Sequence, residues 1–146
     1  MRRALAVMAV AASTVVATPH VAAAAAQDRV TGQGISTAGF GAKVSAHSGP
    51  DGENPRGSFS VEDAEGQKTQ VKITCMFVVG NTAVVGGVDA NGFERFVKVQ
   101  DNGSAGDLAT VASGAAVTPD QLRCAEIFAA LDQLFPITGN FTVEDA

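Results

Sequence analysis

The stretch from Thr69 to Asp101, TQVKITCMFVVGNTAVVGGVDANGFERFVKVQD, decides the fold class. Its first part alternates apolar and polar residues with a period of two, which is typical of a half-buried β-strand. The apolar face is formed by Val71, Ile73, Cys75, Phe77 and Val79. Gly80-Asn81 and Asn91-Gly92 then precede two further apolar runs, Thr82 to Asp89 and Phe93 to Asp101. Because Gly and Asn accept the positive φ of tight hairpin turns, the stretch predicts three antiparallel strands in a meander.

A sequence pattern that occurs twice predicts two more strands, and we call its two copies the echo segments. The pattern G-[SN]-F-[ST]-V-E-D-A occurs at 57–64 and again at 139–146. In both copies Phe and Val are two residues apart, as the inward positions of a strand are. Upstream, Phe40, Ala42, Val44 and Ala46 alternate with polar residues and predict another strand, followed by a loop over His47 to Arg56. We expect the C-terminal copy to pair within the sheet, where it can close a barrel.

One helix is predicted between the meander and the last strand. Thr118-Pro119-Asp120-Gln121 places Thr at the N-cap, Pro at the first helical position and Gln at the capping-box position. An apolar stripe at spacings of three and four follows, made of Cys124, Ile127, Phe128, Leu131 and Phe135. Pro136 is expected to end the helix, since Pro cannot continue a helical hydrogen-bond pattern.

Together these elements predict one all-β domain. We expect an antiparallel β-barrel or β-sandwich of about seven or eight strands with one short helix before the C-terminal strand. The interior is expected to be filled by large side chains, with Phe59, Phe77, Phe93 and Phe141 as the candidates.

The first 26 residues have the three parts of a secretory signal peptide. Arg2 and Arg3 are followed by an uncharged apolar stretch from Ala4 to Ala17 and by the small-residue run Ala22 to Ala26. The pattern predicts cleavage after Ala26, so the secreted domain comprises residues 27–146. The alternative is an uncleaved anchor, but the apolar stretch is shorter than the roughly 20 residues that span a bilayer, and Pro19 interrupts it. No stable membrane span is therefore expected after cleavage, and the protein is expected outside the cell or in its envelope.

Export bears on the two cysteines. Cys75 and Cys124 are predicted on core-facing positions of a strand and of the helix, and two cysteines in a secreted domain allow a single internal pairing. We therefore predict a disulfide between them. A redox-active or metal-binding thiol pair is the alternative, which the absence of a C-x-x-C motif disfavours.

Composition argues against several classes of function. Removal of Arg2 and Arg3 leaves 8 basic against 15 acidic residues, a net charge near −7, so nucleic acid is not an expected partner. The chain has no Trp and no Tyr, the side chains on which sugar rings usually stack, so carbohydrate is not an expected partner. His47 is the one histidine left after cleavage, so a Ser-His-acid or Cys-His catalytic site is not expected. The protein is therefore expected not to be an enzyme, and no cofactor is expected.

Two acidic features are candidate cation sites. The echo segments place Glu62-Asp63 and Glu144-Asp145 at two strand ends that could meet and hold a cation, and the loop Asp101 to Asp107 is rich in Asp, Asn and Gly. Neither offers the six or more oxygens in the spacing that calcium requires, so solvated strand ends and a tight turn are the favoured interpretations and no metal site is predicted.

Several short motifs follow one another along the chain: Gly-Pro-x-Gly-Glu-Asn-Pro at 49–55, Ile73-Thr74-Cys75, Gly80-Asn81-Thr82 with Gly86-Gly87, Asp101-Asn102-Gly103 and the closing Gly-x-Phe-x-Val-x-Asp-Ala. The order of these landmarks resembles a family of small secreted proteins from high-GC Gram-positive bacteria. The resemblance implies an exported β domain and carries no known activity. We thus expect a non-enzymatic interaction or structural protein with an unknown protein or envelope partner. A barrel that binds a small apolar ligand is the alternative.

Overall fold

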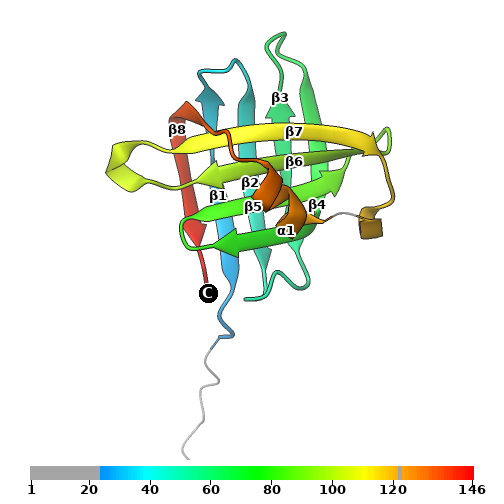
Figure 1. Ribbon diagram of the computed structural model, residues 1–146, viewed down its shortest axis with the longest axis vertical. Coiled ribbons are helices and arrows are strands. Elements are labelled where there is room, and N and C mark those ends of the chain that lie inside the picture. The colour runs from blue at the N-terminus through cyan, green and yellow to red at the C-terminus, as the bar shows by residue number, and fades with distance from the viewer. Residues whose placement is uncertain (1–23, 122) are drawn as a thin grey trace, which may run out of the picture.

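The computed structural model describes residues 24–121 and 123–146. The predicted signal peptide therefore lies almost wholly outside the described residues. Eight antiparallel strands form a closed barrel in which each strand pairs with the next along the chain and the last returns to the first, as Figure 1 shows. The strands are β1 (Asp28–Ser36), β2 (Gly41–Ser48), β3 (Arg56–Glu62), β4 (Lys68–Val79), β5 (Thr82–Val88), β6 (Phe93–Gln100), β7 (Leu108–Ala116) and β8 (Phe135–Glu144). The predicted fold class is confirmed, and of its two alternatives the structure is the barrel rather than the sandwich.

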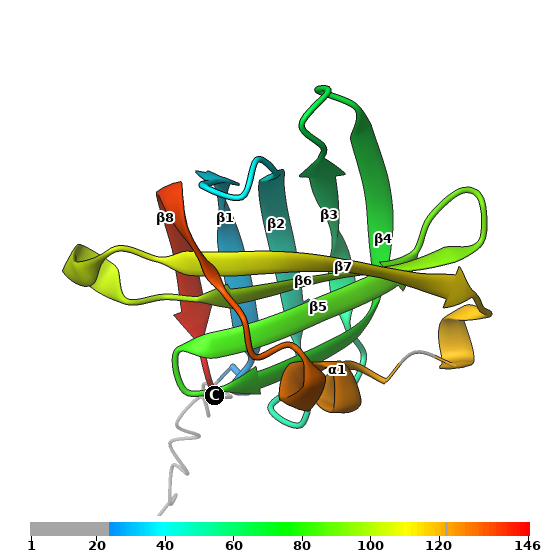
Figure 2. The ribbon, with the colours of Figure 1, turned by 45° about the horizontal axis from the view of Figure 1, so that its top comes forward.

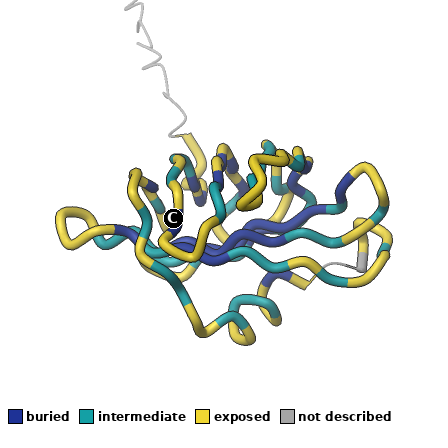
Figure 3. The backbone as a smooth tube through the Cα atoms, turned by 90° about the horizontal axis from the view of Figure 1, so that it is seen from above, coloured by how far each residue is buried: buried dark blue, intermediate teal, exposed yellow. Residues whose placement is uncertain are grey.

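The barrel is flattened into two walls whose strands run in crossing directions. Strands β1 to β4 and β8 form one wall, and β5 to β7 form the other (Figures 1 and 2). The short helix α1 (Cys124–Ala130) lies outside the second wall and contacts β4, β5 and β6. Because β5 and β6 have the interior on one side and α1 near the other, both contain runs of consecutive buried residues, whereas β2 alternates buried and exposed positions (Figure 3).

Large side chains fill the space between the walls. Phe59 and Phe141, the equivalent phenylalanines of the two echo segments, are both 1% exposed and belong to one cluster with Val71 and Ile73. Both echo segments are strands, as predicted, and Val61 and Val143 pack against the same cluster. Two of the four phenylalanines proposed as filling residues are not in this interior. Phe77 packs outside the barrel near α1, and Phe93 is 43% exposed.

A β-bulge explains why Phe77 is on the outside. The register between β4 and β5 shifts between Ile73 and Cys75, so Thr74 is the extra residue. One extra residue reverses the faces of everything that follows it. Met76 and Val78 therefore face the interior, and Cys75 and Phe77 face α1. The prediction that Cys75 and Phe77 share an inward face with Val71 was thus wrong, and Val79 is 51% exposed.

The helix is shorter than its stripe predicted. The Thr118-Pro119 signal begins a 3-10 turn, Pro119–Gln121, and α1 spans Cys124–Ala130. Leu131 follows the helix, and Phe135 and Pro136 belong to β8, where Pro136 pairs with Leu108. The apolar stripe predicted too long a helix because Phe135, its last residue, belongs to the start of β8.

Carboxylates complete the closure of the barrel between β7 and β8. These strands pair only at Leu108↔Pro136 and Ala109↔Phe135 within the described residues. Further along β8, Phe141 N donates to Asp107 Oδ2 at 2.7 Å and Val143 N donates to Asp101 Oδ2 at 3.2 Å. Asp107 Oδ1 also accepts from Asn102 N at 2.9 Å. The acidic loop 101–107 is thus a turn, as predicted, whose side chains bond the open edge of β8.

Glycine allows β1 and β8 to approach closely on the other side of that strand. Gly32 and Gly139 have φ of +139° and +143°, in the region that favours glycine. A Cβ at Gly32 would lie 2.2 Å from the Asn140 carbonyl oxygen, and one at Gly139 would lie 2.2 Å from that of Gln33. Side chains at either position would therefore force these two strands apart.

Candidate functional site

The outer face of the first wall is almost uniformly polar. We call this surface the polar wall. It consists of the outward-facing residues of β1, β2, β3 and β8, together with Lys68, Gln70 and Lys72 of β4. The strand registers align them in rows, for example Asn140, Gln33, Lys43, Ser60 and Gln70 across five strands. Hydroxyl and amide groups dominate these rows, and Ile35, 67% exposed, is the large apolar exception among them. Such a surface can make many hydrogen bonds but offers no Phe, Tyr or Trp ring for stacking.

Basic residues are concentrated on this wall. Eight of the described residues are Lys or Arg, and six of these are exposed. Five of the six lie on the polar wall: Arg29, Lys43, Arg56, Lys68 and Lys72. The wall holds two acidic residues, Glu144, 4.0 Å from Arg29, and Glu62, 3.2 Å from Lys68. The wall is therefore positive although the domain as a whole is acidic.

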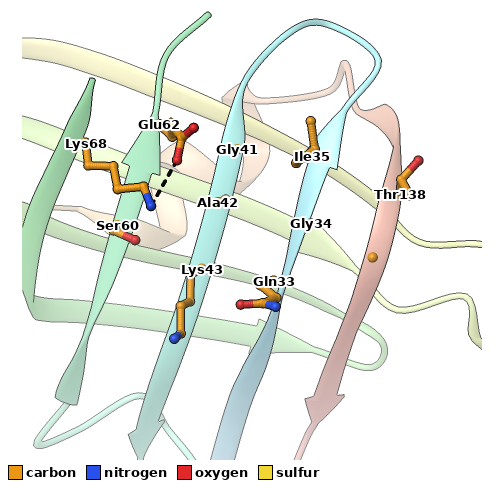
Figure 4. Close-up of a pocket in the computed structure, with 11 residues that line it drawn as sticks. Gln33, Gly34, Ile35, Gly41, Ala42, Lys43, Ser60, Glu62, Lys68 and Thr138 are labelled. Carbon is orange, nitrogen blue, oxygen red and sulfur yellow. Dashed lines mark ion pairs between the residues drawn. The ribbon is translucent and has the colours of Figure 1, made fainter. Parts of the chain in front are cut away.

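The upper part of the polar wall is hollowed into an open groove. The groove has a volume of about 340 Å³ and is lined by Gln33, Ile35, Lys43, Ser60, Thr138 and the Glu62–Lys68 ion pair. Figure 4 shows these side chains rising from neighbouring strands around Gly34, Gly41 and Ala42. Small residues at the centre and long polar ones around them give the wall a place where a partner can approach the backbone.

A second hollow lies at the mouth of the barrel, between the two walls. It has a volume of about 270 Å³. Phe40, Val61 and Thr69 line it from the first wall, and Arg95, Val111 and Ser113 line it from the second. Asp63 and Gln67 of the β3–β4 turn complete its rim. Phe40, Val61 and Val111 also pack against the barrel core, so the bottom of this hollow is apolar.

Arg95 is held rigidly at that mouth. Its Nε donates to Asp89 Oδ2 at 2.9 Å, and its Nη1 donates to Ser113 Oγ. The Asp89 side chain is 3% exposed, and its Oδ1 accepts from Asn91 N and Phe93 N in the β5–β6 turn. Burial opposes ionisation of Asp89, but the hydrogen bonds from Phe93, Arg95 and Asn91 outweigh it and lower its pKa. The pair is therefore charged and fixed at neutral pH.

Beneath α1, a second polar contact attaches the helix to the barrel. Lys98, 7% exposed, donates from Nζ to the carbonyl oxygens of Phe128 and Leu131 at the helix C-terminus, and its Nζ lies 4.4 Å from the centre of the Phe128 ring. Burial lowers the pKa of Lys98, partly offset by the negative charge of Asp132. The ammonium thus serves as a cap for orphan helix carbonyls.

The structure confirms the predicted disulfide. Cys75 and Cys124 are bonded, with Cα atoms 5.8 Å apart. Cys124 is 4% exposed and, with Cys75, belongs to a small cluster between α1 and the barrel. The bond therefore joins the helix to the outside of the barrel wall, rather than joining two positions in the barrel core.

The acidic pairs of the echo segments lie at opposite ends of the barrel. Glu62 pairs across β2 with Gly41, which pairs with Ile35 near the end of β1. Glu144 pairs with Arg29 at the start of β1. The two pairs therefore cannot hold one cation between them. Among residues 24–121 and 123–146, no three His, Cys, Asp or Glu side chains gather as metal ligands would. His47, expected in a loop, lies in β2 on the polar wall beside Arg56.

Sequence reasoning missed Arg95, Asp89 and Lys98. Arg95 shares its strand face with Val97 and Val99, both of which are fully buried in the barrel interior. A charged residue on the inward face of a patterned strand is the signal that could have identified it. No such signal existed for Lys98, because the sequence does not show that α1 covers β6.

Comparisons with family models, with curated proteins and with solved structures found no match. Within the described part of the chain, no helix is long and apolar enough to cross a membrane. The polar wall and the barrel mouth are therefore the features that indicate a function.

Proposed function

We propose that this protein is an exported, non-enzymatic β-barrel that acts by contact, with the polar wall binding an acidic polysaccharide. The observation that carries the proposal is the segregation of charge. Five of the six exposed basic residues in the described chain lie on one wall, and 13 of the 15 acidic residues lie elsewhere. In a domain that would otherwise repel anions, this arrangement favours one orientation towards an acidic partner.

A polymer suits this wall better than a small anion. Single exposed charge contacts contribute about 0–1 kcal/mol each, so affinity has to come from several at once. Strands are spaced about 4.8 Å apart and rise about 3.3 Å per residue, which spreads Lys43, Arg56 and Lys72 over a wide area. The Ser, Thr, Asn and Gln side chains between them can hydrogen-bond to sugar hydroxyls. The proposal departs from the expectation that carbohydrate is not a partner, because that expectation concerned ring stacking. Recognition by charge and hydrogen bonds needs no Trp or Tyr.

Heparin, a sulfated polysaccharide, is a suitable probe for this function. The triple variant Lys43→Gln/Arg56→Gln/Lys72→Gln is expected to bind immobilised heparin at least about tenfold more weakly than the wild type and to elute at lower salt, because salt screens exposed charges. None of these three residues forms an ion pair with another described residue. Affinity measured over a salt series gives both quantities.

A matched control separates the wall from net charge. The variant Ser104→Glu/Ala125→Glu/Ala129→Glu changes the net charge by the same three units at exposed positions of the loop after β6 and of α1. It is expected to bind nearly as the wild type does. Equal losses in the two variants, or a wild type that does not bind heparin at low salt, would overturn the proposal.

The alternative of a small apolar ligand inside the barrel receives less support. Phe59, Phe141 and Ile73 occupy the space between the walls and are at most 2% exposed. An enclosed ligand would have to displace side chains that form the core.

Export itself predicts a defined N-terminus. β1 begins at Asp28, so cleavage after Ala26 would remove the predicted signal and leave the barrel intact. Protein recovered from culture medium is expected to start within a few residues of Gln27, as read by N-terminal sequencing. The variant Ala26→Leu is expected to slow cleavage because the residue before the cut must be small. Medium protein that retains Met1 would contradict the prediction.

A further inference from the structure

We propose that the barrel mouth is a separate binding site for a small monocarboxylate with a short apolar tail, whose carboxylate is held by Arg95. This inference goes beyond the proposed function and is independent of the polar wall. The hollow combines an apolar bottom with one fixed guanidinium, which is the usual composition of a small-molecule site.

Arg95 has donor capacity left over after its structural contacts. Nε and Nη1 are used by Asp89 and Ser113, while Nη2 has no hydrogen-bond partner among the described residues. Because those two contacts fix the plane of the guanidinium, Arg95 loses little further freedom when an acceptor binds. Nη2 keeps both of its N–H donors and Nη1 keeps its second one, so the two oxygens of a carboxylate can accept from these two nitrogens. Arg95 is therefore a preorganised anion donor rather than a fully satisfied structural residue.

The rest of the hollow determines where the two ends of the ligand lie. Asp63, on the opposite rim, repels an anion, so the carboxylate has to bind on the Arg95 side. Asp63 Oδ1 is itself engaged by Glu65 N and Gln67 N, which keeps this carboxylate at the turn. The tail then packs against Phe40, Val61 and Val111 at the bottom of the hollow.

The size of the hollow restricts the ligand further. Its volume of about 270 Å³ is below the roughly 300–1,000 Å³ of sites for drug-sized molecules. Beneath it, Phe59, Val71 and Val97 close the barrel interior. A long acyl chain would find no continuation, so a short-chain acid is the expected class.

Titration with three probes of equal tail length tests the head group. Hexanoate, hexanol and hexylamine are added to the isotope-labelled mature protein, and NMR follows the Arg95 Nε–H signal and the backbone amides around the hollow. Hexanoate is expected to give saturable shifts at Arg95, Val111 and Ser113, with an affinity at least about tenfold higher than that of hexanol. Hexylamine is expected to be weaker still. Equal affinities for the three probes, or no saturable shift with hexanoate, would overturn the proposal.

Variants test the location without breaking the Arg95–Asp89 pair. Thr69→Leu places a larger side chain in the hollow and is expected to weaken hexanoate binding at least about tenfold, with little change in melting temperature. Ser45→Leu, a change of comparable size at an exposed position of β2, is the matched control and is expected to have no effect. Unchanged hexanoate binding in Thr69→Leu would overturn the site.

The two proposals fail separately. Thr69→Leu is expected to retain heparin binding, and the wall triple variant is expected to retain hexanoate binding, because the two sets of residues lie on different faces of the barrel.

Discussion

Replacing both cysteines, Cys75→Ser/Cys124→Ser, is expected to lower the free energy of unfolding by about 4 kcal/mol. The bond closes a loop between residues 49 apart in sequence, and the chain-entropy relation gives a value of this size for such a loop. A small domain has about 5–15 kcal/mol of stability in total, so the loss is a large share. Denaturant unfolding followed by circular dichroism measures it.

The loss should be concentrated at α1. The helix has only seven residues and is too short to be stable alone, so it depends on its attachments to the barrel. Apart from the disulfide these include the Lys98 contacts and the edge-to-face packing of Phe77 and Phe128, whose ring centres are 5.2 Å apart. Ile127 packs in the same cluster between the helix and the barrel. Hydrogen exchange in the double variant is therefore expected to rise first over residues 123–131, while the amides of β1 to β3 stay protected.

Two controls separate the crosslink from the chemistry of serine. The variant Cys75→Ala/Cys124→Ala avoids placing a hydroxyl at the buried Cys124 position and should show most of the same loss. Reduced wild-type protein should behave like the alanine variant. If either control keeps the stability of the oxidised protein, the stabilising effect assigned to the bond is wrong. Two free thiols in protein recovered from the medium would refute the bond itself.

The disulfide also shows what the sequence could predict and for what reason. Its pairing followed from there being two cysteines in a chain expected to be exported, an argument that does not depend on which way either side chain points. The face of Cys75 did depend on orientation and was predicted wrongly, because the bulge at Thr74 adds one residue to an otherwise regular alternation. Met76 and Val78 are apolar as well, so β4 carries apolar residues on both faces beyond the bulge and hydrophobicity alone does not fix the register.

Strand β1 is another case in which local pattern was insufficient. Gly32 and Gly34 interrupt the alternation between Val30 and Ser36, so the sequence pattern predicts no strand there. These glycines are required by the neighbouring strand, since a side chain at Gly32 would meet the backbone of β8, which is more than a hundred residues away in sequence. The pairing of strands also explains why the sequence did not predict the polar wall. Its basic residues come from four strands and gather only once the register is known.

Removing the Asp107 carboxylate, by Asp107→Asn, is expected to lower the free energy of unfolding by about 3 kcal/mol, the second-largest effect we predict. Asp107 is 3% exposed and accepts from Phe141 N and Asn102 N. Asparagine keeps one oxygen but turns an NH₂ group towards the other donor, so one backbone N–H is left unsatisfied. Buried hydrogen bonds to charged groups contribute about 1.5–3 kcal/mol each, and the donor from Phe141 is fully buried. Equilibrium unfolding in urea measures the change.

The loss should appear as opening of the barrel between β7 and β8. Three N–H groups of β8 depend on the 101–107 loop: those of Ile137, Phe141 and Val143, which bond to the Asp107 carbonyl, the Asp107 side chain and the Asp101 side chain. In Asp107→Asn, exchange at Phe141 is therefore expected to increase more than exchange at Val44 of β2, which pairs with β1 and β3 and not with β8. Asp51→Asn, an exposed loop change of equal charge, is the control and should cost less than about 0.5 kcal/mol. If Asp107→Asn is no more destabilising than that control, the short β7–β8 ladder closes the barrel without help from the loop. If Asp107→Asn instead loses exchange protection only at Phe141 and Val143, side-chain hydrogen bonds hold this edge of β8. Backbone hydrogen bonds hold the other seven strand pairs of the barrel.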